Sequence, residues 1–208
     1  MARRLRVRGY LQFVFKEPPM TIIELTPPAV EPLTIAEIRA HLRLDGEEED
    51  GLLLALATVA REHLERETGL VLAARDFRLC LDDWPEDGIL TIARGPVQAV
   101  RVVTVYDGEG EPQVVDLDGH LLDGQARPAR LWLRETPAPG RVMNGIEVEF
   151  SAGFGESGAD VPETLKRAML LHVAAMYACR GVVAADAQPA VVPPGYDRLI
   201  APFCRRGL

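Results

Sequence analysis

Cysteine, serine and histidine are scarce in this 208-residue chain, and their scarcity excludes several kinds of site. The three cysteines, Cys80, Cys179 and Cys204, are odd in number and widely spaced. No C-x-x-C pair occurs, so neither a zinc ribbon nor a disulfide framework is expected. No apolar run reaches the ~18 residues of a membrane span. The short apolar stretch near the N-terminus is interrupted by Gln12 and lacks a cleavage site, so we expect a protein made in the cytosol with no membrane partner.

Residues that could support catalysis are equally sparse. Ser151 and Ser157 are the only serines, and no G-x-S-x-G motif occurs. Of the four histidines, His63 and His172 fall on or beside apolar helical stripes, where packed side chains are expected. GFGESG at residues 153–158 fits G-x-G-x-x-G, but no helix opens at the motif, so a flexible loop is favoured over a dinucleotide site. The sequence therefore predicts neither an enzyme nor a cofactor or metal site.

Charge is divided unevenly along the chain, whose formal net charge is −8. Residues 1–20 contain five basic residues and one acid, a net of +4. The other 18 basic and 30 acidic residues give a net of −12. A basic arm thus precedes an acidic body, and the charge of that body argues against general nucleic-acid binding.

The arm, residues 1–32, is expected to be extended, because five prolines between positions 18 and 32 disfavour a helix, and residues 21–25 could add one short strand. Its pattern permits three interpretations. It could bind phosphate or RNA, or add as a strand to a neighbouring subunit, or be an extension upstream of a start at Met20. The neighbour-docking interpretation assigns contacts to Arg4, Arg6, Arg8, Tyr10 and Phe13.

Helical periodicity marks both ends of the body. Thr34 and Glu37 form a capping box that predicts a short first helix. Residues 48–68 predict a long second helix that ends at Gly69. A third helix, capped by Asp160, carries an apolar stripe over residues 165–176, and residues 195–208 predict a short helical turn with a basic tip.

Apolar and polar residues alternate with a period of two through the middle of the chain. After a first strand from residue 75, strands are predicted at 88–93, 99–107, 112–117, 129–133 and 145–150, separated by Asp-Gly and Asn-Gly turns. The fold class expected is α+β: a helical bundle from the N- and C-terminal helices, with an inserted antiparallel β-sandwich or barrel-like unit. The domains expected are the arm 1–32, a helical connector domain 33–74 and 159–208, and the β unit 75–158.

Four segments then occur in an informative order. Residues 31–72 combine a Pro-Leu-Thr capping segment, a short helix, an acidic link and a long helix that closes in a Thr-Gly turn. The later segments read VEFSAGFG (148–155), VPETLKRAMLLHVAAMY (161–177) and LIAPFCR (199–205). Together they resemble the head–tail connector (adaptor) proteins of tailed bacteriophages over roughly residues 25–208. The composition also suits a prophage or a gene-transfer particle, whereas the basic arm and the proline-rich 182–195 loop depart from the family pattern.

The resemblance implies a structural protein that forms a ring, usually of twelve copies, between the portal and the stopper or tail-completion protein. The ring would sit at the neck of a particle assembled in the bacterial cytoplasm, and DNA would pass through its lumen without sequence-specific binding. The family's C-terminal segment reaches the portal, which points to Tyr196, Leu199, Ile200, Pro202, Phe203, Arg205 and Arg206.

Two further hypotheses accompany this resemblance. The acids Glu47, Glu48, Glu49 and Asp50 are candidates for the lumen or a subunit interface, with a solvated helix start as the simpler interpretation. The alternative function is a nucleic-acid-binding accessory protein that uses the basic arm.

Overall fold

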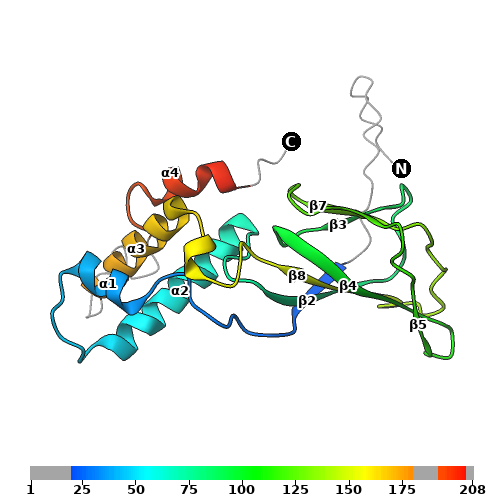
Figure 1. The fold of residues 1–208 in the computed structure, drawn as a ribbon, viewed down its shortest axis with the longest axis horizontal. Helices are drawn as coiled ribbons and strands as arrows, with labels where there is room; N and C mark the ends of the chain where they lie inside the picture. Colours follow the sequence, from blue (N-terminus) through cyan, green and yellow to red (C-terminus); the bar gives the residue numbers. More distant parts are fainter. Residues whose placement is uncertain (1–19, 180–191, 205–208) are drawn as a thin grey trace, which may run out of the picture.

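The computed structural model describes residues 20–179 and 192–204 and places helices at one end and antiparallel sheets at the other (Figure 1). The α+β class is therefore confirmed. Among the described residues, no helix is long and apolar enough to cross a membrane.

Four α-helices form the helical end, and most of their predicted signals are present. They are α1 (Ile35–Leu42), α2 (Asp50–Thr68), α3 (Glu163–Ala178) and α4 (Tyr196–Ile200), with 3₁₀ turns η1 (Gly158–Asp160) and η3 (Ala201–Phe203). The capping box of Thr34 and Glu37 starts α1. Gly69 ends α2 with a φ of 71°, a left-handed conformation that glycine adopts without strain.

The predicted cap of the third helix is wrong. Pro162 is the residue before α3, and Asp160 belongs to the preceding turn η1. The Asp160 carboxylate accepts the Ser157 backbone N–H at 3.0 Å, and the Ser157 hydroxyl accepts the Ala159 N–H at 3.2 Å. The carboxylate therefore closes a capping box one turn earlier and is not available to α3.

Two antiparallel sheets form the other end. The five-stranded sheet has the order β1-β2-β8-β4-β5, and the three-stranded sheet has the order β3-β7-β6. Their bounds are β1 Met20–Glu24, β2 Arg75–Leu81, β3 Ile89–Ile92, β4 Val97–Tyr106, β5 Pro112–Val114, β6 Leu121–Asp123, β7 Ala129–Trp132 and β8 Ile146–Ala152. The described residues hold eight strands: six in the middle of the chain were expected, β1 falls where residues 21–25 were expected to add a short strand, and β6 lies in a segment read only as turns.

Each end has its own apolar core. The sheet core takes residues from both sheets, and Phe77 on β2 stacks on Phe150 of β8 with ring centroids 5.6 Å apart. The helical core includes Ile38, Leu64, Leu165 and Met169 from α1, α2 and α3, each fully buried. Burial of this kind contributes roughly 1.5–3 kcal/mol per large apolar side chain, so each end is stabilised largely by its own packing.

The GFGESG segment is a close crossing rather than the flexible loop expected. Gly153 has a φ of 138°, and a Cβ there would lie 2.5 Å from the Ala74 Cα. Ala73 and Gly155 form a parallel bridge, and the Ala74 N–H donates to the Gly155 carbonyl at 2.8 Å. Glycine is required at position 153 because two backbones pass there without room for a side chain.

Candidate functional site

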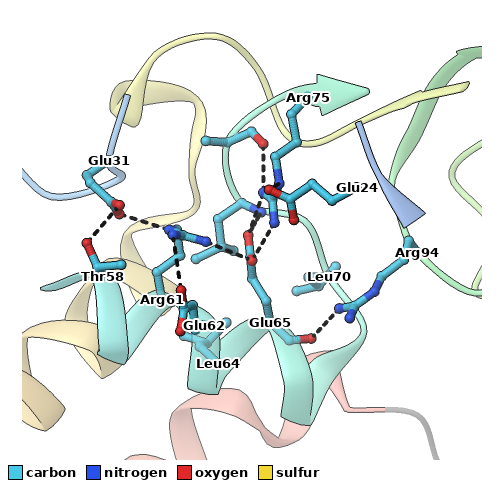
Figure 2. Close-up of polar contacts among 12 residues, drawn as sticks. Glu24, Glu31, Thr58, Arg61, Glu62, Leu64, Glu65, Leu70, Arg75 and Arg94 are labelled. Carbon is cyan, nitrogen blue, oxygen red and sulfur yellow. Dashed lines mark hydrogen bonds and ion pairs between the residues drawn. The ribbon is translucent and has the colours of Figure 1, made fainter. Parts of the chain in front are cut away.

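A buried ion-pair network occupies the junction between the helices and the sheets (Figure 2). Its centre is Glu65 on α2, whose side chain is 5% exposed. Arg75 at the start of β2 donates to both carboxylate oxygens of Glu65, Nη1 to Oε1 at 3.0 Å and Nη2 to Oε2 at 2.8 Å. The Leu72 backbone N–H donates to Oε1 at 2.8 Å, and Arg61 Nη1 donates to Oε2 at 3.2 Å. The carboxylate thus holds the turn that leads from α2 into β2.

The network extends to the segment that joins β1 to α1. Arg61 Nε donates to Glu31 at 2.9 Å, and the other Glu31 oxygen accepts the Thr58 hydroxyl at 3.0 Å. Arg75 Nε lies 3.1 Å from a Glu24 oxygen. This nitrogen has no hydrogen bond within the described residues, so the contact is an ion pair without hydrogen-bond geometry. Glu24 and Glu31 thus draw the chain before α1 onto α2 and β2.

Burial and charge act in opposite directions on Arg75. Burial lowers the pKa of its guanidinium, but the hydrogen bonds and charge of Glu65, with the charge of Glu24, raise that pKa overall. The guanidinium also lies 5.1 Å from the centroid of the Phe77 ring. A group held charged in this way keeps its geometry at any working pH, so the network is suited to fixing the angle between helices and sheets and has no evident acid–base role.

The C-terminal segment, residues 195–204, was predicted to make an external contact, and part of it lies in the subunit's own core. Tyr196 and Ile200 are 0% and 4% exposed and belong to the helical core. The Tyr196 ring lies 5.6 Å from the His172 ring and 5.8 Å from the His63 ring. Both side chains therefore attach α4 to α2 and α3, and neither is accessible to a partner.

The rest of this segment is more open. Pro202 is exposed, whereas Leu199 and Phe203 are half-buried against the helical core. Arg127, in the loop before β7, donates to the Thr68 carbonyl at 2.7 Å and also to the Phe203 carbonyl. The sheet end thus holds the C-terminal tip directly. Arg205 and Arg206 lie outside the described residues, so their contact stays a prediction.

Three of the four acids around the start of α2 make contacts within the subunit. Arg39 on α1 donates to Asp50 at 2.7 Å and to Glu47 at 3.4 Å. Glu49 accepts the hydroxyl of Tyr177 on α3. Glu47 and Glu48 are exposed, while Glu49 and Asp50 are half-buried. These contacts join α1, α2 and α3, and the lumen or interface role stays a prediction that falls chiefly on the two exposed acids.

The remaining predictions concern the N-terminal arm and metal binding. The arm residues Arg4, Arg6, Arg8, Tyr10 and Phe13 lie outside the described residues, so docking on a neighbour is untested. Within residues 20–179 and 192–204, no group of three or more histidine, cysteine or acidic side chains is arranged to hold a metal ion.

The buried network was not predicted from the sequence. Its one local signal is the Arg61–Glu65 spacing of four residues along the helix, which is common on exposed faces as well. The other charged partners are distant in sequence: Arg75 lies 10 residues from Glu65 and 51 from Glu24, and Arg61 lies 30 from Glu31. Arg75 gave no further signal, because its strand also contains the charged residues Asp76 and Arg78.

The phage gp6-like head-tail connector family matches residues 32–110 of the chain. A chain in a structure described as the neck of an empty GTA (gene transfer agent) particle computed with C6 symmetry shares 30% identity, with a TM-score of 0.76. That match covers 90% of this chain and 97% of the other. No curated protein sequence gives a significant match.

Two further solved structures show the same coverage. One, described as the virion of a native gene transfer agent particle, gives 31% identity and a TM-score of 0.74 over 90% of this chain and 97% of that one. The other, described as the neck of a native GTA particle computed with C12 symmetry, gives 31% identity and a TM-score of 0.70 over the same shares.

Proposed function

Since the chain belongs to the phage gp6-like head–tail connector family, we propose that it is a structural connector subunit at the neck of a phage-like particle. The observation that carries the proposal is the match to a chain of a GTA particle neck over 97% of that chain's length. The same fold, with both the helical and the sheet end, is therefore used in a neck. Assembly would take place in the bacterial cytoplasm, and the role is non-enzymatic.

The subunits would form a closed ring, which we propose contains twelve copies. The C6 and C12 symmetry of the matched neck structures supports a ring of this order. Exposed apolar side chains on α2 support subunit contacts, since Leu52, Leu54 and Val59 are 39%, 44% and 48% exposed. Heterologous contacts that close on themselves produce such rings.

The lumen of the ring would let DNA pass without holding it. The body has a net charge of −12, so a lumen lined by it offers few lysine or arginine contacts to phosphate. Each such contact adds affinity through counterion release, and a sliding duplex requires few of them. Glu47 and Glu48, both exposed, are the acids before α2 that best fit a lumen or interface position.

The portal would bind the C-terminal tip, and the stopper or tail-completion protein would bind the opposite side. Tyr196 and Ile200 anchor the tip to the helical core, so the surface left for the portal is Leu199, Pro202 and Phe203 with Arg205 and Arg206. An aromatic ring beside arginines is typical of residues that dominate protein interfaces.

Truncation after Cys204 tests this proposal without disturbing the core, because it removes Arg205 and Arg206 and keeps Tyr196 and Ile200. We expect the truncated chain, combined with Phe203→Ala, to bind purified portal protein roughly tenfold or more weakly. DNA-filled heads carrying it should fail to join tails in electron micrographs. Native mass spectrometry would verify that the subunit still folds and forms rings.

A charge reversal far from the tip is the matched control. Arg134 is exposed in the loop after β7, and Arg134→Glu should leave portal binding and tail joining unchanged. Normal portal binding and normal tail joining by the truncated Phe203→Ala chain would refute the assignment of the tip.

A further inference from the structure

One edge of the three-stranded sheet carries an acidic loop and an apolar hollow side by side. β3 has β7 as its only strand neighbour, so one edge of β3 has no paired strand in the described chain. A hollow beside β3 is lined by Trp84 and Pro85, by Leu90 on β3, and by Leu131 and Leu133 on and after β7. The surface thus offers backbone groups and an apolar seat to an extended segment.

The loop that joins β2 to β3 gives this surface its charge. Its four acids, Asp82, Asp83, Glu86 and Asp87, are termed here the acidic loop. Three of their carboxylates each accept a single backbone N–H, from Asn144, Trp84 and Ile89. Across the ranges 20–179 and 192–204, none of the four forms an ion pair.

Three other acids of the sheet end have cationic partners. Asp76 pairs with Arg101 at 3.0 Å, and Asp123 pairs with Arg130 at 2.5 Å. Glu149 pairs with Arg78 at 2.6 Å. Four like charges within six residues repel one another, so a basic segment lying over the acidic loop would relieve that repulsion.

The described chain begins at Met20, beside this surface. Met20 of β1 is the register partner of Leu81, the last residue of β2, and the acidic loop starts at the next residue. Pro18 and Pro19, which precede β1 in the sequence, have no backbone N–H to donate to a longer β1–β2 ladder. Leu90 of β3 belongs to the sheet core, and Met20 of β1 packs against the same core.

We propose that residues 3–16 of the arm dock on the acidic loop and the β3 edge of the same subunit. The five basic residues of the arm would pair with the four acids, and Tyr10, Phe13 and Phe15 would lie against the half-buried Trp84 and Pro85. Tethering through a few residues gives the arm an effective concentration in the millimolar range at its own subunit's surface. The proposal is independent of the neck function and replaces docking on a neighbour as the primary contact.

Amide exchange and fluorescence test the docking in the full-length chain. In a Trp132→Phe background, Trp84 is the one remaining tryptophan and reports on the hollow. Removal of residues 1–19 should shift its emission to the red and speed the exchange of the β3 amides roughly tenfold, which corresponds to about 1.4 kcal/mol of protection. Unchanged emission and unchanged exchange would overturn the proposal.

Neutralising the acidic loop should have the same effect with the arm present. Asp83→Asn and Asp87→Asn keep the oxygens that accept backbone N–H groups, and Glu86→Gln completes the set. The matched control neutralises three exposed acids near β5, by Glu109→Gln, Glu111→Gln and Asp118→Asn. An equal change in Trp84 emission and β3 amide exchange in the control would show a general effect of charge and would refute specific docking on the acidic loop.

Dilution separates the chain's own arm from that of a neighbour. If the arm docks on its own subunit, Trp84 emission and β3 protection stay constant as the protein is diluted to monomers. Loss of both signals on dilution would overturn the proposal in favour of docking between copies. Arm-dependent DNA binding that leaves β3 exchange unaffected would overturn it in favour of the nucleic-acid interpretation.

Discussion

Replacing His172 with leucine should remove a defined part of the pH dependence of stability. The His172 side chain on α3 is 2% exposed, and neither ring nitrogen has a hydrogen-bond partner among the described residues. Burial, assisted by the charge of His63 on α2, lowers the pKa of His172 from 6.5 to about 4. Tyr196 on α4 is the third ring of this cluster and carries no positive charge.

The sign follows from proton binding in the two states. The folded pKa is depressed, so between about pH 6.5 and pH 4 the unfolded chain binds more protons at this site than the folded chain. The associated stability is complete above the unfolded pKa of 6.5 and is lost as the pH falls through the window toward 4. The loss from pH 8 to pH 5 is about 2 kcal/mol, approaching roughly 3 kcal/mol at lower pH.

Urea unfolding of the parent and of His172→Leu at pH 8 and pH 5 measures this loss. Titrating carboxylates act on both proteins, so the quantity of interest is the difference between their pH dependences, which should be about 2 kcal/mol. At pH 8 the variant should be at least as stable, because it removes two buried polar atoms without partners. His120→Gln, in the turn before β6, should behave as the parent does. Equal pH dependence in parent and His172→Leu would refute the reasoning.

Three other substitutions have expected outcomes in urea unfolding at neutral pH. Glu65→Gln should cost about 3 kcal/mol by leaving two buried arginines without their shared carboxylate, whereas Glu62→Gln, exposed on the same helix, should cost under about 0.5 kcal/mol. Gly153→Ala should cost about 2 kcal/mol or more, because a Cβ would meet the Ala74 backbone at a positive φ, and a neutral result would contradict the close crossing. Tyr196→Phe should be neutral or stabilising, because the hydroxyl is buried with no partner in the described chain; a loss above about 1 kcal/mol would indicate a hydrogen bond to it.

Elements with a strong local signal were predictable from the sequence. The Thr34–Glu37 capping box and Gly69 at the end of α2 fix helix ends through contacts within a few residues. In β2 and in β8, apolar residues recur at every second position because one face of each strand is buried. β6 was missed because its three residues lie between turn dipeptides and are held only by pairing with β7. Asp160 was misassigned because Ser157, three residues earlier, competes for the same carboxylate.

The ion-pair network could not be predicted from the sequence, because its residues come together only in the folded chain. Glu31, Arg61 and Glu65 meet because α2 packs under the segment before α1, and no spacing in the sequence specifies that. Tyr196 was expected to face a partner because the family resemblance implies that the C-terminal segment reaches the portal, and the sequence does not specify which side of so short a helix meets its own core. The structure shows that the face of Tyr196 and Ile200 meets its own core.

The helical core is assembled from two separated parts of the chain, and this sets an order for folding during synthesis. α1 and α2 are made first but bury their apolar faces against α3 and α4, which follow more than ninety residues later. All eight strands have been translated before α3 begins. The strands can therefore pair on the ribosome before the partners of α1 and α2 have been synthesised. Arg127 is likewise synthesised before Phe203, whose carbonyl it contacts. A nascent or truncated chain without α3 lacks the residues that bury the apolar faces of α1 and α2, so its helical core cannot close.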